Sequence, residues 1–306
     1  MPVVSVILNV RNGAATLREA IDSVLAQSCS DWELIVWDDR STDNSAAIIT
    51  GYRDARIRYH LSPEDVPLGK ARADAIRQAT GEWIAFLDQD DVWLPRKLES
   101  QLALAEDNVG LIYGRTVRFY PGGLQRDYDQ THEYKPLPEG DIFTQLFTDS
   151  CFIAMSSAIF RREAIESVGG IPHEVHIIPD YYLYVAVART YPTRAVQEVV
   201  CRYRAHSDSM SHTTALEMHY EVLRLIERWA QQLDPQTVAA CRRRHFTAIA
   251  LQEMRSRSTL HQGMARLLTQ GSLRSQLVRP FAFVFHLIRR NVRPPVWRRL
   301  SSKSGV

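Results

Sequence analysis

The chain has 306 residues, of which 45% are hydrophobic and 24% charged, with a formal net charge of +2. This composition is typical of a soluble globular protein with a substantial core. The four cysteines form no CxxC pair, which argues against a zinc site or a disulfide framework and favours a reducing compartment. No apolar run approaches the roughly 18 residues of a membrane span. A strand-like N-terminus also argues against a signal peptide.

Positive and negative charges are segregated along the chain. Residues 242–306 contain 13 arginines and one lysine against a single acid, Glu253, whereas the other residues carry 23 basic and 34 acidic side chains. This asymmetry predicts an acidic catalytic body and a basic C-terminal region that meets an anionic surface.

Strand-like and helical patterns alternate over about the first 90 residues. Such alternation predicts βαβ units and a parallel sheet. Strands are expected at residues 4–8, 32–37, 56–60 (an edge strand) and 84–87, and helices at 14–28, from about 44, and at 69–80.

The following residues continue the α/β pattern and then become helical. From about residue 214 the spacing is helical throughout, so we place a domain boundary between residues 1–212 and residues 213–306. Before that boundary we expect helices at 95–106 and 180–190, strands at 110–120, 156–161 and 196–203, and a polar, tyrosine-rich loop at 125–138.

Acidic residues follow two of the predicted strands. Asp38 and Asp39 end the second strand, and Asp88, Asp90 and Asp91 follow the fourth. The carboxyl ends of parallel strands meet at one edge of an open sheet, where ligands bind. Clustered carboxylates repel one another unless a cation shares them, and Mg²⁺ or Mn²⁺ takes oxygen ligands of this kind beside substrate phosphates. The alternative is an acidic turn that caps the next helix.

Five segments stand out along the chain: VSVILN at 4–9, VWDDRSTD at 36–43, GEWIAFLDQDD at 81–91, Pro179-Asp180 and YRAH at 203–206. In order and in spacing, this set resembles the family 2 glycosyltransferases. Those enzymes are inverting and metal-dependent, have a GT-A fold and use nucleotide sugars. The resemblance implies a Rossmann-like α/β domain with a mostly parallel sheet, a nucleotide-binding half at 1–107 and an acceptor-binding half at 108–212.

The resemblance also assigns roles to individual residues. The general base that deprotonates the acceptor hydroxyl would be Asp180. Mn²⁺ or Mg²⁺ would be held by Asp88 and Asp90, with His206 as a further candidate ligand. The donor nucleotide would contact Asn9, Arg11, Asp38, Asp39, Arg72 and Asp88, with Asp39 the better candidate for the base and Arg72 for the diphosphate.

Three positions depart from the family pattern. Arg40 stands where the family usually has glycine, Pro179 where it has glutamate, and Arg11 where relatives often place an aromatic residue. Asp39 and Asp180 also have a simpler interpretation as helix caps. The guanidinium of Arg11 can stack on a nucleobase, but an arginine at this position leaves the identity of the donor nucleotide less certain.

Two other classes of function remain open. The Asp88-Gln89-Asp90 segment also matches the motif of haloacid dehalogenase-like phosphatases, although that motif normally follows the first strand. A catalytically inactive module that binds nucleotide sugars or membranes is the second alternative. A dinucleotide oxidoreductase is excluded because no GxGxxG follows the first strand.

The C-terminal stretch from Leu277 to Leu300 mixes aromatic residues with arginines and has no acids. This pattern favours a segment in an anionic membrane interface, with a packed helical hairpin or a nucleic-acid patch as alternatives. We therefore expect a cytoplasmic enzyme at the inner membrane face. It would transfer a sugar from a nucleoside-diphosphate sugar, UDP-linked by the resemblance, to a glycan or lipid-linked glycan in surface polysaccharide synthesis, with no nucleic-acid partner and an undetermined oligomeric state.

Overall fold

The computed structural model describes residues 2–120, 125–126, 135–149, 151–205, 214–254 and 262. Most of the predicted loop at 125–138, the candidate ligand His206 and the basic stretch from Leu277 to Leu300 lie outside these residues. The chain divides into two compact units, Met1–Leu233 and Asp234–Val306. Each is described by itself.

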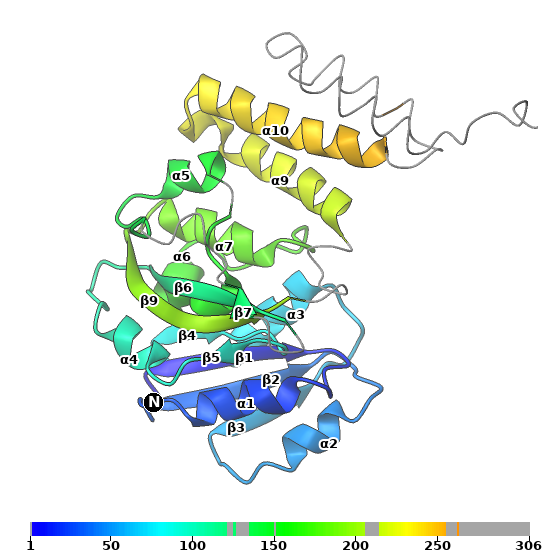
Figure 1. The fold of residues 1–306 in the computed structure, drawn as a ribbon, viewed down its shortest axis with the longest axis vertical. Helices are drawn as coiled ribbons and strands as arrows, with labels where there is room; N and C mark the ends of the chain where they lie inside the picture. Colours follow the sequence, from blue (N-terminus) through cyan, green and yellow to red (C-terminus); the bar gives the residue numbers. More distant parts are fainter. Residues whose placement is uncertain are drawn as a thin grey trace, which may run out of the picture. The chain divides into compact units, whose positions relative to one another are not determined.

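Over its described residues, the first unit is built on a nine-stranded sheet with the order β3-β2-β1-β4-β8-β6-β9-β5, and β7 pairs with β6. Figure 1 shows β1 to β3 at one end of this unit. The strands are β1 (Val4–Val10), β2 (Trp32–Asp38), β3 (Ile57–Leu61), β4 (Trp83–Phe86), β5 (Val92–Trp93), β6 (Leu111–Phe119), β7 (Gln125–Arg126), β8 (Ile159–Arg161) and β9 (Thr193–Arg204).

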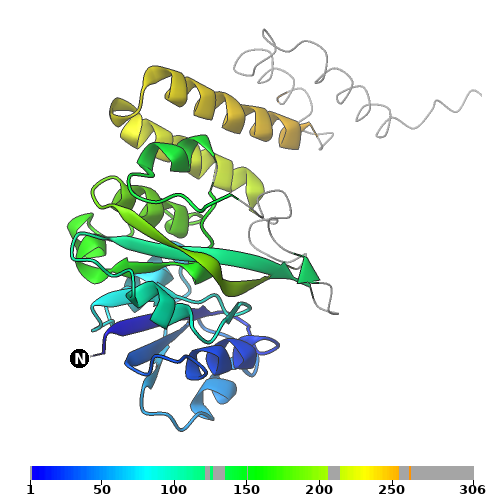
Figure 2. The same cartoon turned by 60° about the vertical axis from the view of Figure 1, so that its left-hand side comes forward.

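The predicted parallel arrangement of the first four strands is confirmed. β1 pairs in parallel with both β2 and β4, and β2 pairs in parallel with β3, which is the edge strand. The sheet as a whole is mixed, because β8 runs antiparallel to β4 and β6. β6 and β9 are long parallel partners that lie side by side in Figures 1 and 2.

Helices cover both faces of the N-terminal strands. α1 (Leu17–Leu25) buries Leu17, Ala20, Ile21 and Val24 against alternate apolar residues of β1 and β2. The intervening residues of β1 face the other side, because successive strand side chains alternate. There α3 (Leu68–Ile76) packs against both strands. α2 (Ser45–Thr50) lies near α1 and β2.

The second half of the first unit carries the remaining helices. They are α4 (Lys97–Leu102), α5 (Phe143–Thr148), the 3₁₀ turn η1 (Met155–Ser157), α6 (Arg162–Ser167), α7 (Pro179–Ala188), α9 (Ala215–Trp229) and η2 (Ala230–Gln232). Apart from Asp180, every residue of α7 is buried, which explains its uniformly apolar sequence.

Three predicted helices are shorter than the sequence pattern suggested, and one of them, expected at 69–80, ends as α3 at Ile76. The helix expected at 95–106 is limited to α4, and the one expected at 14–28 to α1. After α4 the N–H groups of Leu104 and Ala105 bond to carbonyls three residues back, so the chain tightens into a 3₁₀-like turn and the helix ends. Apolar periodicity continues beyond the helix because these turn residues also pack on the core.

The described part of the second unit consists mainly of α10 (Pro235–Glu253). Asp234 caps this helix by accepting a hydrogen bond from the Thr237 N–H, and Pro235 occupies the first turn, where a missing N–H costs nothing. Among the described helices, none combines the length and the apolar character needed to cross a membrane.

Candidate active site

Three parallel strands deliver the site residues to one edge of the sheet. Asn9 in β1 lies opposite Trp37 in β2, and Val10 lies opposite Asp38, so the two strands end at the same level. β4 pairs with β1 on its other side, and Asp88 follows it. Arg11, Asp39 and Asp88 therefore emerge at the carboxyl edge together, as expected for an open α/β sheet.

Asp38 and Asp39 have different surroundings. Asp38 is buried, and its two carboxylate oxygens accept hydrogen bonds from the Ser41 N–H at 2.7 Å and the Tyr59 hydroxyl at 2.9 Å. Asp39 is also buried, but one of its oxygens, Oδ1, has no partner among the described residues. The buried amide nitrogen of Asn9 likewise has none. Asp39 and Asn9 thus retain polar capacity for a ligand, whereas Asp38 holds the turn after β2.

The turn after β2 contains Arg40, at the position where glycine was expected from the resemblance. Arg40 has a φ of 56°, in the left-handed region that glycine adopts most readily. The chain therefore follows the backbone path of a glycine turn despite the arginine side chain, whose Nη1 donates to the Pro63 carbonyl at 3.2 Å.

Arg11 makes contacts with three neighbouring side chains, those of Asp39, Asp65 and Gln89. Its Nη1 donates to Asp39 Oδ2 at 3.1 Å, and its two terminal nitrogens form a fork onto the exposed carboxylate of Asp65. The side-chain amide of Gln89 both accepts from the Arg11 N–H at 2.9 Å and donates to its carbonyl at 3.2 Å. The middle residue of the Asp88-Gln89-Asp90 motif thereby fixes the loop that carries Arg11.

Arg72 and Asp88 form the central ion pair. Arg72 lies on α3 with a side chain only 6% exposed, and its Nη2 donates to Asp88 Oδ1 at 2.6 Å. The Asp88 side chain is 38% exposed, so it keeps an accessible oxygen beside a buried positive charge. This pair places a buried cation beside a partly exposed carboxylate at the carboxyl edge of the sheet.

Asp91 joins the acidic loop to the second half of the sheet. It accepts hydrogen bonds from the Ser156 hydroxyl at 2.6 Å and from the Arg204 N–H at 2.9 Å. The Ser156 hydroxyl in turn accepts from the Asp88 N–H at 3.1 Å, and Arg204 Nε donates to the Asp90 carbonyl at 2.8 Å. Burial, together with the charges of Asp88 and Asp90, raises the pKa of Asp91.

Asp180 lies in the first turn of α7, where it accepts a hydrogen bond from the Tyr181 N–H at 2.8 Å. The residue is half-buried. Burial raises the pKa of Asp180, the positive charge of Arg72 opposes this shift, and the negative charge of Asp88 adds to it. Asp180 is not the cap of α7, because the N-cap is Ile178 and no described side chain caps this helix end. The charges of both members of the central ion pair act on Asp180.

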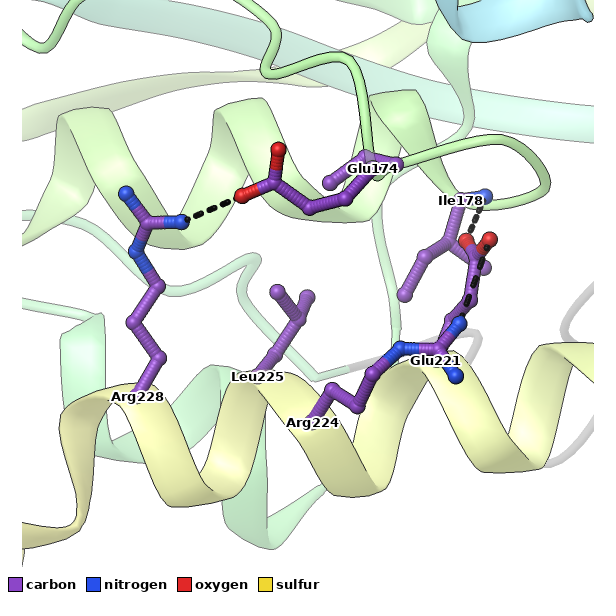
Figure 3. A pocket seen from close by; sticks show the side chains of 7 residues that line it. Glu174, Ile178, Glu221, Arg224, Leu225 and Arg228 are labelled. Atoms are coloured by element: carbon purple, nitrogen blue, oxygen red, sulfur yellow. Dashed lines mark hydrogen bonds and ion pairs between the residues drawn. The ribbon is translucent and has the colours of Figure 1, made fainter.

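A glutamate from α9 supports the segment before Asp180. Glu221 is buried and accepts hydrogen bonds from three consecutive backbone N–H groups, those of His176, Ile177 and Ile178, at 2.9 to 3.1 Å. Figure 3 shows Glu221 beneath Ile178. Since Pro179 begins α7, this carboxylate fixes the chain at the point where the helix starts.

A shallow pocket adjoins this support but does not include the acidic site residues. Apolar side chains of Val175, Ile178 and Leu225 line it, and Arg228 closes one side through an ion pair with Glu174 at 3.2 Å (Figure 3).

The carboxylates of the acidic loop suit a divalent cation whose remaining ligands come from a substrate. Asp88 and Asp90 offer two partly exposed carboxylates, and Mg²⁺ typically binds one or two carboxylates together with substrate phosphates. Within the described ranges, no three His, Cys, Asp or Glu side chains form a ready-made metal cluster. His206 lies outside those ranges, so its role stays a prediction.

Sequence patterns did not point to four residues that matter here, namely Asp65, Gln89, Ser156 and Glu221. The only sequence signal for Gln89 was its place inside the acidic motif. Its closeness to Gly13, where a Cβ would lie 2.5 Å from Gln89 Oε1, is evident only in the structure. The other three come from distant segments whose proximity only the fold creates.

Comparison with known proteins agrees with this geometry. The family model described as glycosyl transferase family 2 matches residues 5–169, more than half of the chain. The chain belongs to glycosyl transferase family 2. The family model spans β1, β2 and β4 with the Asp39 and Asp88–Asp90 positions, and the phosphatase alternative is thereby set aside.

Relatives of this family 2 chain include two Escherichia coli proteins named UDP-Glc:alpha-D-GlcNAc-diphosphoundecaprenol beta-1,3-glucosyltransferase. WfgD is 38% identical over 112 residues, 36% of this chain and 44% of WfgD. WfaP is 29% identical over 213 residues, 69% of this chain and 80% of WfaP. An uncharacterized glycosyltransferase of Nostoc is 32% identical over 212 residues, 66% of this chain and 65% of that protein. The chain thus spans less than two thirds of WfgD and of the Nostoc protein.

Solved structures establish the fold of this family 2 member. Staphylococcus aureus TarS 1–349 in complex with UDP-GlcNAc superposes with a TM-score of 0.68 at 20% identity, over 86% of this chain and 79% of that one. The mannosyltransferase PcManGT from Pyrobaculum calidifontis, in complex with GDP-Man and Mn²⁺, gives a TM-score of 0.63 at 20% identity, over 94% and 81%. The expected GT-A fold is confirmed.

Proposed function

We propose that this protein is an inverting glycosyltransferase that moves a sugar from a UDP-sugar to a hydroxyl of a lipid-linked glycan. The observation that carries the proposal is the Arg72–Asp88 ion pair with Asp180 in electrostatic reach of both. In this proposal Asp180 would be the general base, Arg72 the cation for the phosphates and Asp88 a carboxylate for the metal ion.

The donor would lie along the edge of the sheet, from the base side to the acidic loop. Asp39 and Asn9 each have a polar atom without a partner in the described part of the chain, which would serve the nucleoside. Arg72 supplies a buried positive charge for the diphosphate. Asp88 and Asp90 would hold Mn²⁺ or Mg²⁺, which neutralises charge on the departing nucleotide when it is bound. Asp38, whose oxygens are filled by the protein itself, would contribute by shaping the turn.

Asp180 would act on the acceptor. Its carboxylate takes the proton of the attacking hydroxyl, the acceptor oxygen forms a bond to the anomeric carbon, and the bond to the nucleoside diphosphate breaks on the opposite face. Inversion follows from this single displacement. Because burial raises its pKa, Asp180 is a stronger base than an ordinary exposed aspartate.

The acceptor class rests on the relatives. WfgD and WfaP are named for transfer to a diphosphoundecaprenol-linked sugar. An acceptor of that kind lies at a membrane, which fits the basic composition of residues 242–306. We therefore place the enzyme at the cytoplasmic face of the inner membrane, in surface polysaccharide synthesis, with residues 1–212 as its catalytic domain and 213–306 as its helical basic region.

A panel of nucleotide sugars, incubated with the full chain, Mn²⁺ and a diphospholipid-linked sugar, tests the proposal by mass spectrometry of the lipid product. We expect transfer from a UDP-sugar and at least a 100-fold loss in Asp180→Asn, within the range removed with a general base. The matched control Asp107→Asn changes a carboxyl on a loop outside the site and is expected to leave transfer intact. Equal transfer by Asp180→Asn and the unmodified chain would reject the assignment.

A further inference from the structure

Arg11 and Asp39 together present a hydrogen-bond donor next to an acceptor at the base side of the site. The Arg11 guanidinium has five N–H bonds, of which three go to Asp39 and Asp65. Its side chain is 51% exposed, and its remaining N–H bonds have no partner among the described residues, so they can meet a ligand. The loop that carries Arg11 is fixed on both backbone groups by Gln89, which ties its position to the acidic motif.

Asp39 has acceptor capacity that the protein leaves unused. A carboxylate has about four acceptor positions. Among the described residues, Asp39 accepts one side-chain hydrogen bond, from Arg11, and its Oδ1 has no partner although the side chain is only 10% exposed. A buried carboxylate oxygen without a donor is costly, so an N–H group from a ligand is expected to complete it.

From this pair we infer that Arg11 is a specificity-determining residue, which reads the base of the donor jointly with Asp39. The inference rests on the proposed function. Asp39 accepts from the ring N–H of the base, and Arg11 donates to the adjacent carbonyl oxygen. The pair therefore selects bases with a neighbouring C=O and N–H, such as uracil or guanine. Cytosine is rejected because it presents a ring-nitrogen acceptor to Asp39 and an amino donor to Arg11.

Asp65 determines the direction of the guanidinium. Its carboxylate accepts hydrogen bonds from both terminal nitrogens of Arg11, with Nη2 to Oδ2 at 2.8 Å. A two-point contact of this kind fixes the plane of an arginine, which a single contact leaves free to rotate. An aromatic residue at position 11 would offer stacking to any base. The Arg11–Asp65 fork offers directional donors instead, so discrimination among bases is the property it adds.

Calorimetric titration of the full chain with UDP and CDP, each with Mn²⁺, tests the inference. We expect UDP to bind at least about 10-fold more tightly than CDP, because mispaired polar groups are strongly penalised. In Arg11→Met the ratio is expected to fall about 10-fold, mainly through weaker UDP binding. Asp65→Asn should also lower the ratio of UDP affinity to CDP affinity. The control Arg53→Met removes an exposed arginine elsewhere and should leave the ratio unchanged.

The outcomes separate this inference from the proposed function. A ratio of UDP affinity to CDP affinity that is the same in the unmodified chain and in Arg11→Met overturns the inference, even if sugar transfer is intact. The absence of transfer from every nucleotide sugar overturns the proposed function, while the binding ratio still decides the role of Arg11. Equal binding of UDP and CDP by the unmodified chain also overturns the inference.

Discussion

The buried guanidinium of Arg72 donates a 2.6 Å hydrogen bond to Asp88, and its charge also acts on Asp180. One arginine from α3 thus joins the carboxylate proposed to hold the metal ion to the carboxylate proposed to accept the proton. Because the three groups share an electrostatic environment, a change at Arg72 is expected to alter the titration of Asp180 as well as donor binding.

Arg72→Gln is expected to move the acidic limb of the pH profile of kcat/KM to higher pH. Burial raises the pKa of Asp180 and Arg72 opposes that rise, so removing the positive charge raises the pKa further. A general base works only when it is unprotonated. As the pH is lowered, the variant is therefore expected to lose activity at a higher pH than the unmodified chain does. Initial rates from pH 5 to 9 measure the limb. Arg72→Lys, which keeps the charge, should shift it less, and an unmoved limb in Arg72→Gln would contradict the coupling.

Gly13→Ala is expected to weaken donor binding by disturbing Gln89. A Cβ at position 13 would lie 2.5 Å from Gln89 Oε1, so the amide must give up its contacts with the Arg11 backbone. We expect the KM for the donor to rise about fivefold, in line with one lost hydrogen bond. In a Gln89→Ala background the added alanine should have little further effect. Fully additive effects in the double variant would show that the two residues act independently.

Glu221→Ala should destabilise the protein, because three backbone N–H groups lose a buried charged acceptor. The expected loss is about 2–4 kcal/mol in the free energy of unfolding, measured by urea denaturation. Glu221→Gln keeps one acceptor oxygen and should lose less. The control is Glu217→Ala, an exposed position on the same helix, with an expected change within about 0.5 kcal/mol. A loss no greater than in this control would count against the anchoring role.

Lys97 makes stability depend on pH. Its side chain is fully buried, donates to Gln101 at 2.6 Å and lies 4.1 Å from the Trp93 ring centroid, and burial lowers the pKa of Lys97 to about 7. An unfolded lysine keeps its proton up to about pH 10. Between these values the unfolded chain binds more protons, so the contribution of Lys97 to stability rises with pH.

Comparison of Lys97→Met with the unmodified chain isolates this contribution. The free energy of unfolding of the variant minus that of the unmodified chain is expected to fall by about 2 kcal/mol from pH 7 to pH 9. Urea denaturation at several pH values measures the difference. A difference that stays constant over this range would mean that Lys97 does not change protonation in the folded protein within it.

Local sequence patterns predicted the elements of the nucleotide-binding half well. Strands β1, β2 and β4 were recognisable because each is an apolar run, β-branched in β1 and β2 and flanked by polar residues, and the acids after β2 and β4 were predicted to meet at one edge. Helix ends were predicted less well, as α1 and α4 show, because turn residues that pack on the core continue the apolar spacing.

The site was predictable only in part, for a related reason. Motif spacing pointed to Asp39, Asp88, Asp90 and Asp180 through resemblance to a family. The resemblance favoured Asp39 over Asp38 for the base but gave no physical reason. The structure supplies one, because Ser41 and Tyr59 fill the oxygens of Asp38, whereas the buried Oδ1 of Asp39 has no partner among the described residues. The two aspartates are neighbours in a strand end, and their difference arises from the alternation of side chains and from what the fold packs beside each.

The amino-acid order by itself determined which segments form parallel strands and which carboxylates follow them, because both depend on local periodicity and on the shared edge of such strands. The tertiary structure alone decided the partnerships: Arg72 with Asp88, Arg11 with Asp39 and Asp65, Gln89 with the Arg11 backbone, and Glu221 with the chain before Asp180. Each of these joins residues 16 to 78 positions apart in the chain. Contacts at such separations are set by packing and charge in three dimensions, which no local pattern encodes.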